Sequence, residues 1–268
     1  MHFHDTLDDT PGFMSHHDVD AEQEMNRLLA AGGTPPMGED PFVFGDERLA
    51  PARIVGLLRP HMRERRLDRI QAVVAGRTRS VVPVVEGLVN TGNVSAVMRS
   101  AEALGHQDVH VVAGQNERYK HSQRTAQGAQ HWLDVWHWDG PAACAAHLKD
   151  AGYRLVATHL HADTVPIREL DFTEPTALIF GNEEAGVTDA MLAETDAACE
   201  VPLPGFTESF NVSVAAAVAL YHAQQDRLDR QGHHADLSDE AQARLVARFC
   251  LRSVTNAEKI IRRKLGER

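Results

Sequence analysis

The sequence lacks the features that mark membrane, secreted and disulfide-stapled proteins. It has no apolar run of about 18 residues or more, so it predicts no membrane-spanning helix. Its first residues, MHFHDTLDDT, show no basic region followed by an apolar stretch, so no secretory signal is predicted. Its three cysteines, Cys144, Cys199 and Cys250, are too widely spaced for a CxxC metal pair and odd in number for a disulfide framework. We therefore expect a protein of the reducing cytoplasm.

Common catalytic fingerprints are also missing. No GxGxxG follows a predicted strand, which argues against a dinucleotide site, and neither GxSxG nor HExxH occurs. One glycine pair has the spacing of a phosphate-binding P-loop, but Asn93 and Val94 stand where that loop needs Lys and Ser or Thr. His159 and His161 share one face of a predicted strand without a third ligand. We interpret these histidines as structural and expect no metal site.

Positive charge is scarce overall but concentrated in two segments. The 268 residues carry a net charge of -11, which at first argues against a nucleic-acid partner. Residues 51–82, however, hold eight Arg against two acids, and residues 241–268 hold eight Lys or Arg against two acids. Because phosphate contacts depend on local basic patches, these segments are candidates for binding nucleic acid. Charge alone favours a plainer interpretation, two solvated helix faces.

Composition divides the chain into four parts. Residues 1–46 are acidic and poor in apolar periodicity, so we expect a disordered extension. Residues 47–79 are basic and have a helical pattern, broken near a proline. Residues 80–231 form the main domain, and residues 232–268 form a linker followed by a basic helix that Ser238 can cap.

Short β-rich runs alternate with helical runs in the main domain. Strands are expected at 80–87, 108–114, 154–160, 176–181 and 198–203. Helices are expected at 93–104, 141–152 and 211–230. This alternation predicts an α/β fold, a parallel sheet with helices on both faces, flanked by the N-terminal and C-terminal helices.

Arg99 belongs to the first of three polar clusters, NTGNVSAVMRSA, at a predicted strand-to-helix turn. Apolar residues spaced three and four apart form the buried stripe of this helix: Val94, Val97, Ala101 and Leu104. Arg99 lies about 180° from that stripe at roughly 100° per residue. It is therefore expected to point outward near the carboxyl end of a strand, where ligands bind in open α/β sheets.

Two further clusters follow predicted strands. The segment FGNEEAG places Glu183 and a second carboxylate between two glycines, which let a backbone approach a ligand closely. The segment VPLPGFTESFNVS is a Pro/Gly loop that places Ser209 and Asn211 at the entrance of an alanine-rich helix. For these two residues, simple N-capping is the alternative interpretation.

In this order, the three clusters resemble the three motifs of the SpoU-type RNA ribose 2′-O-methyltransferases of the SPOUT superfamily. The resemblance covers roughly residues 80–230 and is closest to the members that modify guanosine 18 of the tRNA D-loop. It implies a deep trefoil knot in the C-terminal part of the domain, S-adenosylmethionine as the cofactor and tRNA as the substrate. It also implies a homodimer with its active site at the subunit interface. The acidic extension departs from the family pattern.

The resemblance further implies roles for single residues. Arg99 matches the family's catalytic arginine; because a guanidinium keeps its proton, we favour a clamp on the target phosphate, with a phosphate oxygen or another neighbour accepting the proton. Asn93 and Ser209 are expected to position Arg99 and the ribose, and Glu183 and Asn211 to orient the loop. The implied cofactor-binding residues are Thr158, His159, Leu160, Phe180, Gly181, Asn182, Gly186, Val201, Leu203, Ser209 and Asn211.

The two basic segments become the expected tRNA surface under this resemblance. Its predicted members are Arg63, Arg65, Arg66, Arg69, Arg77, Arg79, Arg262, Arg263 and Lys264. Two alternatives stay open at this point. The substrate could be ribosomal RNA or another tRNA position, or the chain could be an RNA-binding module without catalysis.

Overall fold

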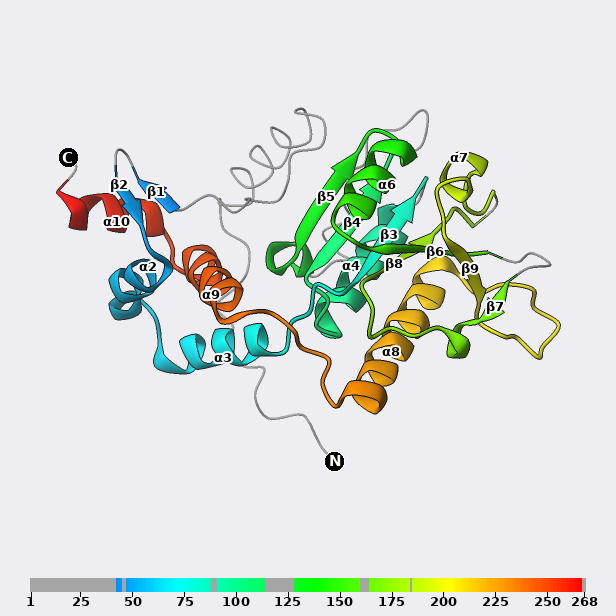
Figure 1. The fold of residues 1–268 in the computed structure, drawn as a ribbon. Coiled ribbons are helices and arrows are strands. Elements are labelled where there is room, and N and C mark those ends of the chain that lie inside the picture. Colours follow the sequence, from blue (N-terminus) through cyan, green and yellow to red (C-terminus); the bar gives the residue numbers. More distant parts are fainter. Residues whose placement is uncertain are drawn as a thin grey trace.

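The structure, a computed structural model, describes residues 42–44, 47–87, 91–113, 128–159, 164–183 and 185–266. Figure 1 shows a sheet domain with a smaller group of helices beside it. The sheet domain runs from β3 to the end of α8. The smaller group, here called the helical module, combines residues 42–75 with residues 239–266, so the two ends of the described chain lie together.

Within the described residues, seven strands pair in parallel in the order β5-β4-β3-β8-β6-β9-β7. Their bounds are β3 Val81–Glu86, β4 Asp108–Val112, β5 Asp134–Trp138, β6 Arg154–Thr158, β7 Val165–Pro166, β8 Thr176–Phe180 and β9 Ala197–Glu200. The central strands β3 and β8 are buried along their whole length, as expected for a sheet covered on both faces.

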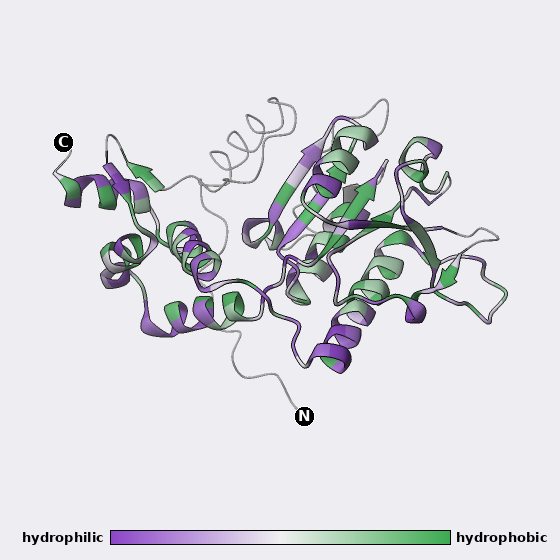
Figure 2. Ribbon diagram, viewed as in Figure 1, coloured by the Kyte–Doolittle hydropathy of each residue, from purple (hydrophilic) through white to green (hydrophobic). Residues whose placement is uncertain are grey.

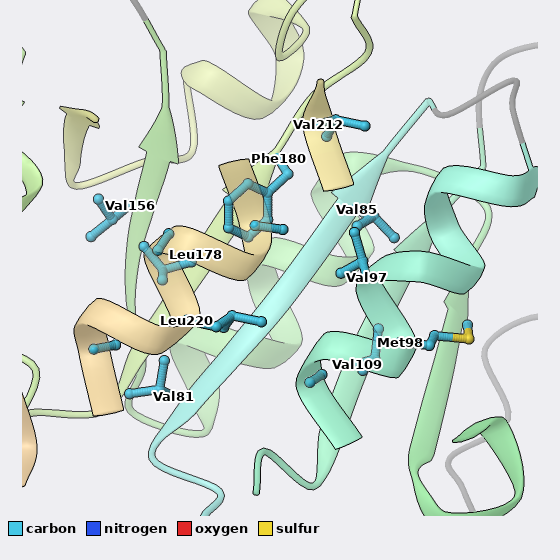
Figure 3. Packing of buried hydrophobic residues seen from close by; sticks show 14 of the residues in the cluster. Val81, Val85, Val97, Met98, Val109, Val156, Leu178, Phe180, Val212 and Leu220 are labelled. Atoms are coloured by element: carbon cyan, nitrogen blue, oxygen red, sulfur yellow. The ribbon is translucent and has the colours of Figure 1, made fainter. Parts of the chain in front are cut away.

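One face of the sheet is covered by α4 (Thr91–Ala103) and α8 (Val212–Gln231). Val81 and Val85 point to this face from β3, and Figure 3 shows Val97 and Leu220 approaching them from the two helices. The stripe predicted for α4 is confirmed, since Val94, Val97 and Ala101 are buried in this core and Leu104 packs against it. α8 contributes small residues, Ala216, Ala219 and Ala223, and packs closely against α4.

The opposite face is covered by α6 (Pro141–Asp150) and the short α7 (Asp189–Leu192). Val82 and Val84 point to this face because neighbouring side chains of a strand alternate in direction. Cys144 and Leu148 of α6 complete this second core. The prediction of an α/β fold with helices on both faces is therefore confirmed.

The helical module has its own apolar core. Its elements are β1 Phe42–Phe44, β2 Glu47–Leu49, α2 Pro51–Leu58, the 3₁₀ turn η1 Arg59–His61, α3 Glu64–Ala75, α9 Asp239–Ser253 and α10 Ala257–Leu265. α9 contacts both α2 and α3, and α10 contacts α2. In Figure 2, α3 and α10 carry hydrophilic and hydrophobic residues in alternating bands, as amphipathic helices do.

The boundary predicted at residue 46 for the acidic extension is too late. Phe42–Phe44 form strand β1, which pairs antiparallel with β2, and Phe44 is only 6% exposed in the module core. The helix predicted to start at residue 47 is wrong for its first residues, because 47–49 belong to β2. Residues 1–41 lie outside the described residues, so the disorder expected there stays a prediction.

Other predicted elements are confirmed with shifted ends, and some were missed. β5 was missed, and it forms one edge of the sheet. The C-terminal helix is two helices, because the chain turns at Asn256, which has a left-handed backbone with φ of 57°. Ser238 caps the first of them by accepting a hydrogen bond from the Ala241 backbone N–H, as predicted.

The described residues form neither a membrane span nor a cluster of metal ligands. None of their helices has both the length and the apolar content of a membrane span. No group of three or more His, Cys, Asp or Glu side chains gathers among them in a way that could hold a metal ion.

Candidate active site

The three polar clusters meet at the carboxyl edge of the parallel sheet. The first follows β3 and opens α4, and the second is the segment after β8, residues 181–188, here called the β8 loop. The third is the segment after β9, residues 201–211, here called the β9 loop, which leads into α8. Since β3 pairs with β8, β8 with β6 and β6 with β9, the loops that follow these strands leave the same edge.

Asn93, Glu183 and Asn211 join the three clusters through side-chain hydrogen bonds. Asn93 Nδ2 donates to Glu183 Oε1. Asn211 Nδ2 lies 3.1 Å from the same Glu183 oxygen and 3.3 Å from Asn93 Oδ1. One carboxylate oxygen therefore accepts from two amides that come from different helix entrances. This contact was not predicted from spacing, although all three residues were on the predicted site list.

Asn211 also caps α8. Its Oδ1 accepts from the Ser213 backbone N–H at 3.0 Å and from Ser213 Oγ at 2.6 Å. The capping interpretation is therefore confirmed, while the functional role of Asn211 stays a prediction. The oxygen fixes the start of the helix, which leaves the Nδ2 group to reach Glu183.

The β8 loop is tied down at both ends. Asn182 and Gly186 exchange backbone hydrogen bonds at 2.9 and 2.8 Å, and Asn182 Nδ2 donates to the Gly87 carbonyl at 3.1 Å. Gly181 cannot be replaced here, because a Cβ atom at that position would lie 2.1 Å from the Gly186 carbonyl carbon. Gly186 has a left-handed backbone with φ of 70°. The two glycines thus permit the sharp turn that presents Glu183.

Arg99 is exposed on α4, as predicted from the stripe on the opposite side of that helix. It lies six residues beyond Asn93, about 9 Å of rise along the helix axis. Ser209 is exposed in the β9 loop, next to Phe210, and Phe206 in the same loop is fully exposed. These side chains are exposed to solvent and do not belong to the core.

The residues predicted to bind the cofactor gather at the same edge. Thr158 ends β6 and donates from Oγ1 to the Ile179 carbonyl, while the His159 backbone N–H donates to the Cys199 carbonyl. A Cβ atom at Gly186 would lie 3.8 Å from the His159 ring. The Phe180 side chain is buried in the core, so only its backbone can face a ligand. Leu160 lies outside the described residues.

The β9 loop offers unused backbone groups. No hydrogen bond is made by residues 202–210 to any residue that the structure describes. Val201 anchors the start of the loop against the core, and Leu203 is half-buried. A loop of this kind, beside the glycines of the β8 loop, has the donors and acceptors that suit a nucleoside with an amino-acid tail.

The expected tRNA surface is accessible at most of its predicted positions. Arg63, Arg65 and Arg69 are exposed at or near the start of α3, and Arg263 is exposed on α10. Others have internal contacts: Arg66 lies over the Trp132 ring at 5.2 Å, Arg262 pairs with Glu258 at 2.9 Å, and Lys264 donates to the Leu57 carbonyl at 2.6 Å.

Two arginines of the predicted tRNA surface form ion pairs with carboxylates of the sheet domain. Arg77 is 1% exposed and forms an ion pair with Glu102 at 2.7 Å, so the prediction that it contacts tRNA is wrong. Arg79 binds two buried carboxylates, at 2.5 Å to Asp108 and by a short contact to Asp134, so its charge is already balanced. Arg77 lies in a segment with the composition of a surface patch, which is why the charge pattern misplaced it, whereas the Arg79 side chain is 40% exposed and its contact with tRNA stays a prediction.

Asp134 belongs to a buried charge cluster that the sequence analysis missed. Its carboxylate binds Arg79 and, at 2.7 Å, Arg248 of α9, so it ties the sheet domain to the helical module. Burial opposes its ionisation, but Arg248 and Arg79 outweigh that effect and lower the pKa of Asp134. Burial raises the pKa of Asp108 to about 6 against the opposing effect of Arg79. The available signal was an acid opening each of two apolar strands.

The chain is similar in sequence to a family of RNA methyltransferases. The SpoU rRNA Methylase family model matches residues 80–221, more than half of the chain. The chain is 36% identical over 166 residues to a tRNA (guanosine(18)-2′-O)-methyltransferase of Escherichia coli, which covers 62% of this chain and 72% of that protein. It is 32% identical over 187 residues to the 23S rRNA (guanosine(2553)-2′-O)-methyltransferase RlmP of Bacillus subtilis, which covers 69% of this chain and 70% of that protein.

The chain is also similar to solved structures of SpoU enzymes. The crystal structure of the A. aeolicus TrmH/SpoU tRNA modifying enzyme superposes with a TM-score of 0.66 at 29% identity, over 72% of this chain and 98% of that one. The SpoU methyltransferase AviRb from Streptomyces viridochromogenes, solved in complex with AdoMet, has a TM-score of 0.52 at 29% identity. That match covers 61% of this chain and 65% of the AviRb chain.

Proposed function

The chain belongs to the SpoU rRNA Methylase family, and from that premise we propose that it methylates the ribose 2′-hydroxyl of guanosine 18 in tRNA with S-adenosylmethionine as the methyl donor. One observation carries this proposal: Asn93, Glu183 and Asn211, from three separate clusters, meet at the carboxyl edge of the sheet. Ligands of open α/β sheets bind at that edge.

The cofactor is assigned to the β8 and β9 loops and the end of β6. The backbone groups of residues 202–210, which make no hydrogen bond to the described residues, and the small residues Gly181 and Gly186 suit it. Thr158 and His159 border the same space. Bound there, S-adenosylmethionine supplies an electrophilic sulfonium methyl group. The protein's task is to hold the ribose hydroxyl in line with that methyl group and to exclude water.

Arg99 is proposed as the residue that holds the substrate. A guanidinium keeps its proton at neutral pH, so it is a poor base, but its planar fork binds a phosphate through two parallel hydrogen bonds. Asn93, in the helix that carries Arg99, is held by Glu183, and Ser209 is exposed in the β9 loop, where the ribose is proposed to bind. The proton of the 2′-hydroxyl passes to a phosphate oxygen or another neighbouring acceptor.

The exposed arginines of α3 and α10 are proposed to bind the tRNA backbone, since they lie on the module that flanks the sheet domain. Ribosomal RNA is the second candidate substrate. It is favoured by the similarity to the Bacillus subtilis 23S enzyme, which is close to that for the tRNA enzymes.

A homodimer is proposed from an apolar stripe on α8. Val214, Val218 and Tyr221 of α8 are 38–54% exposed and spaced four and three residues apart, so they share one helix face, and Phe210, 40% exposed, lies just before the helix. Exposed apolar faces of this kind mark interfaces. Because the stripe begins beside Asn211, a second copy docked on it would close the active site. The deep trefoil knot of the family is proposed for the same C-terminal part of the sheet domain.

Labelled methyl transfer from S-adenosylmethionine, followed by mapping of the modified nucleotide, tests the function. Transfer to guanosine 18 of bulk tRNA is expected, and transfer only to ribosomal RNA would establish the second candidate. Arg99→Ala is expected to lose methyl transfer at least a hundredfold while still binding the cofactor. Near wild-type turnover in that variant would refute the clamp, and Arg168→Ala, an exposed arginine on η3 (Ile167–Glu169), is the control.

A further inference from the structure

We propose that Glu86 is a positioning residue, whose buried carboxylate sets the β8 loop and thereby the cofactor site. The inference rests on the proposed function, since it assigns a purpose to a residue outside the three motif clusters. Glu86 is the last residue of β3 and is 2% exposed. It was not singled out in the sequence, where it only ends an apolar strand.

Both oxygens of Glu86 are used by one residue of the β8 loop. Oε2 accepts from the Thr188 backbone N–H at 3.0 Å, and Oε1 accepts from Thr188 Oγ1 at 2.6 Å. The same Thr188 hydroxyl accepts from the Met191 backbone N–H at 3.2 Å. That hydroxyl must therefore point its proton at Glu86, so the bonds form a directed chain from α7 to β3.

The other end of the β8 loop is held by the residue that follows Glu86 in the sequence. Asn182 Nδ2 donates to the carbonyl of Gly87, the residue that follows Glu86. Both ends of the loop are thus held by two consecutive residues at the end of β3. Glu183 lies between these anchors, and it is the carboxylate that binds Asn93 and Asn211. Releasing Thr188 would free one end of the loop that carries this contact.

Stability alone does not explain a carboxylate at this position. Burying a charge costs free energy unless a partner compensates. Among the described residues Glu86 has no cationic partner, and its side-chain hydrogen bonds are the two from Thr188. An apolar side chain that filled the same space would avoid the cost of burying this charge. The carboxylate orients Thr188. Its two acceptor oxygens lie on one rigid group, so together they fix both the position and the rotation of that residue.

Substitutions at both ends of the contact test the proposal. Glu86→Gln keeps the size of the side chain but can accept only one of the two hydrogen bonds, since its Nε2 is a donor. Thr188→Val keeps the backbone bond to Glu86 Oε2 but loses both hydroxyl bonds, the donation to Glu86 Oε1 and the α7 cap from the Met191 N–H. Thr188→Ser keeps both bonds and serves as the conservative rescue. Glu194→Gln, in an exposed ion pair with Lys149, is the matched control.

The first readout needs no ligand. Hydrogen exchange of the free protein is expected to show faster exchange of the Thr188 amide in Glu86→Gln, with unchanged exchange in β3 and β8. The second readout is calorimetric binding of S-adenosylmethionine. We expect roughly tenfold weaker binding in Glu86→Gln, equal to about 1.4 kcal/mol, a smaller loss in Thr188→Val, and wild-type binding in Thr188→Ser and Glu194→Gln. The KM for tRNA should stay unchanged.

Wild-type amide exchange and cofactor affinity in Glu86→Gln would overturn the proposal. Equal weakening in Thr188→Ser would overturn it too, since that variant retains both bonds. Should Glu86→Gln fail to fold, Thr188→Val decides alone, by its amide exchange and its affinity. Failure of the proposed function has a different signature, because a wild-type protein that binds no S-adenosylmethionine would leave the exchange result intact.

Discussion

Asn211 allows stability and chemistry to be separated by a choice of substitution. Its Oδ1 caps α8 and its Nδ2 donates to Glu183. Asn211→Ala removes both contacts. Loss of an N-cap costs about 1 kcal/mol, which for a chain of this size lowers the melting temperature by roughly 2–4 °C. Asn211→Ser keeps a good cap but is too short to reach Glu183, so its melting temperature should stay close to that of the wild type.

Methyl-transfer activity and melting temperature should not change together in Asn211→Ala and Asn211→Ser. A hydrogen bond to a charged group contributes about 1.5–3 kcal/mol; because Asn211 is exposed, the lower end applies, which is roughly tenfold in kcat/KM. Asn211→Ser and Asn211→Ala should therefore lose methyl transfer to a similar degree, measured with labelled S-adenosylmethionine on tRNA. If Asn211→Ser keeps wild-type kcat/KM, the contact with Glu183 has no part in the site and Asn211 is only a cap.

Four other predictions concern the basic segment, the N-terminal residues and the α8 stripe. Reversing the charge of the exposed arginines in 63–69 should weaken tRNA binding and flatten the slope of log affinity against log salt by about 0.7–0.9 per lost phosphate contact; an unchanged slope would exclude this segment. Deleting residues 1–41 should leave turnover unchanged and raise tRNA affinity at low salt, since a net-acidic tail competes with phosphate. Deleting 1–46 instead should lower the melting temperature, because it removes β1 and the buried Phe44. Val218→Asp should give a monomer in sedimentation, and a dimer that survives it would place the interface elsewhere.

The sheet domain could be predicted from the sequence wherever local pattern and burial agree. The apolar stripe of α4 fixed the outward direction of Arg99, and the apolar runs of β3 and β8 located the buried centre of the sheet. β5 was not predicted because its residues, DVWHW, mix an acid and a histidine with aromatics. The strand also lies at an edge of the sheet. Edge strands are half-buried, so their composition carries a weaker signal.

Contacts between distant segments could not be predicted, because they depend on packing of the whole chain. Arg77 and Arg65 look alike in sequence, yet one is buried against Glu102 and the other faces solvent. The convergence of Asn93 and Asn211 on Glu183 could be anticipated only as a shared edge, since spacing gives no side-chain direction in loops. Glu86 could not be identified at all, because its partner is 102 residues away.

The helical module has a consequence for synthesis on the ribosome. Its first part, ending with α3, is made early, but α9, which completes its core, begins at residue 239. Roughly 160 residues separate the two parts, which takes on the order of 8–30 s at typical translation rates. During that interval the apolar sides of α2 and α3 lack α9 and α10, which supply the rest of the module core. Nascent chains stalled before α9 should therefore bind holding chaperones through these helices, and chains stalled after α10 has left the exit tunnel should not.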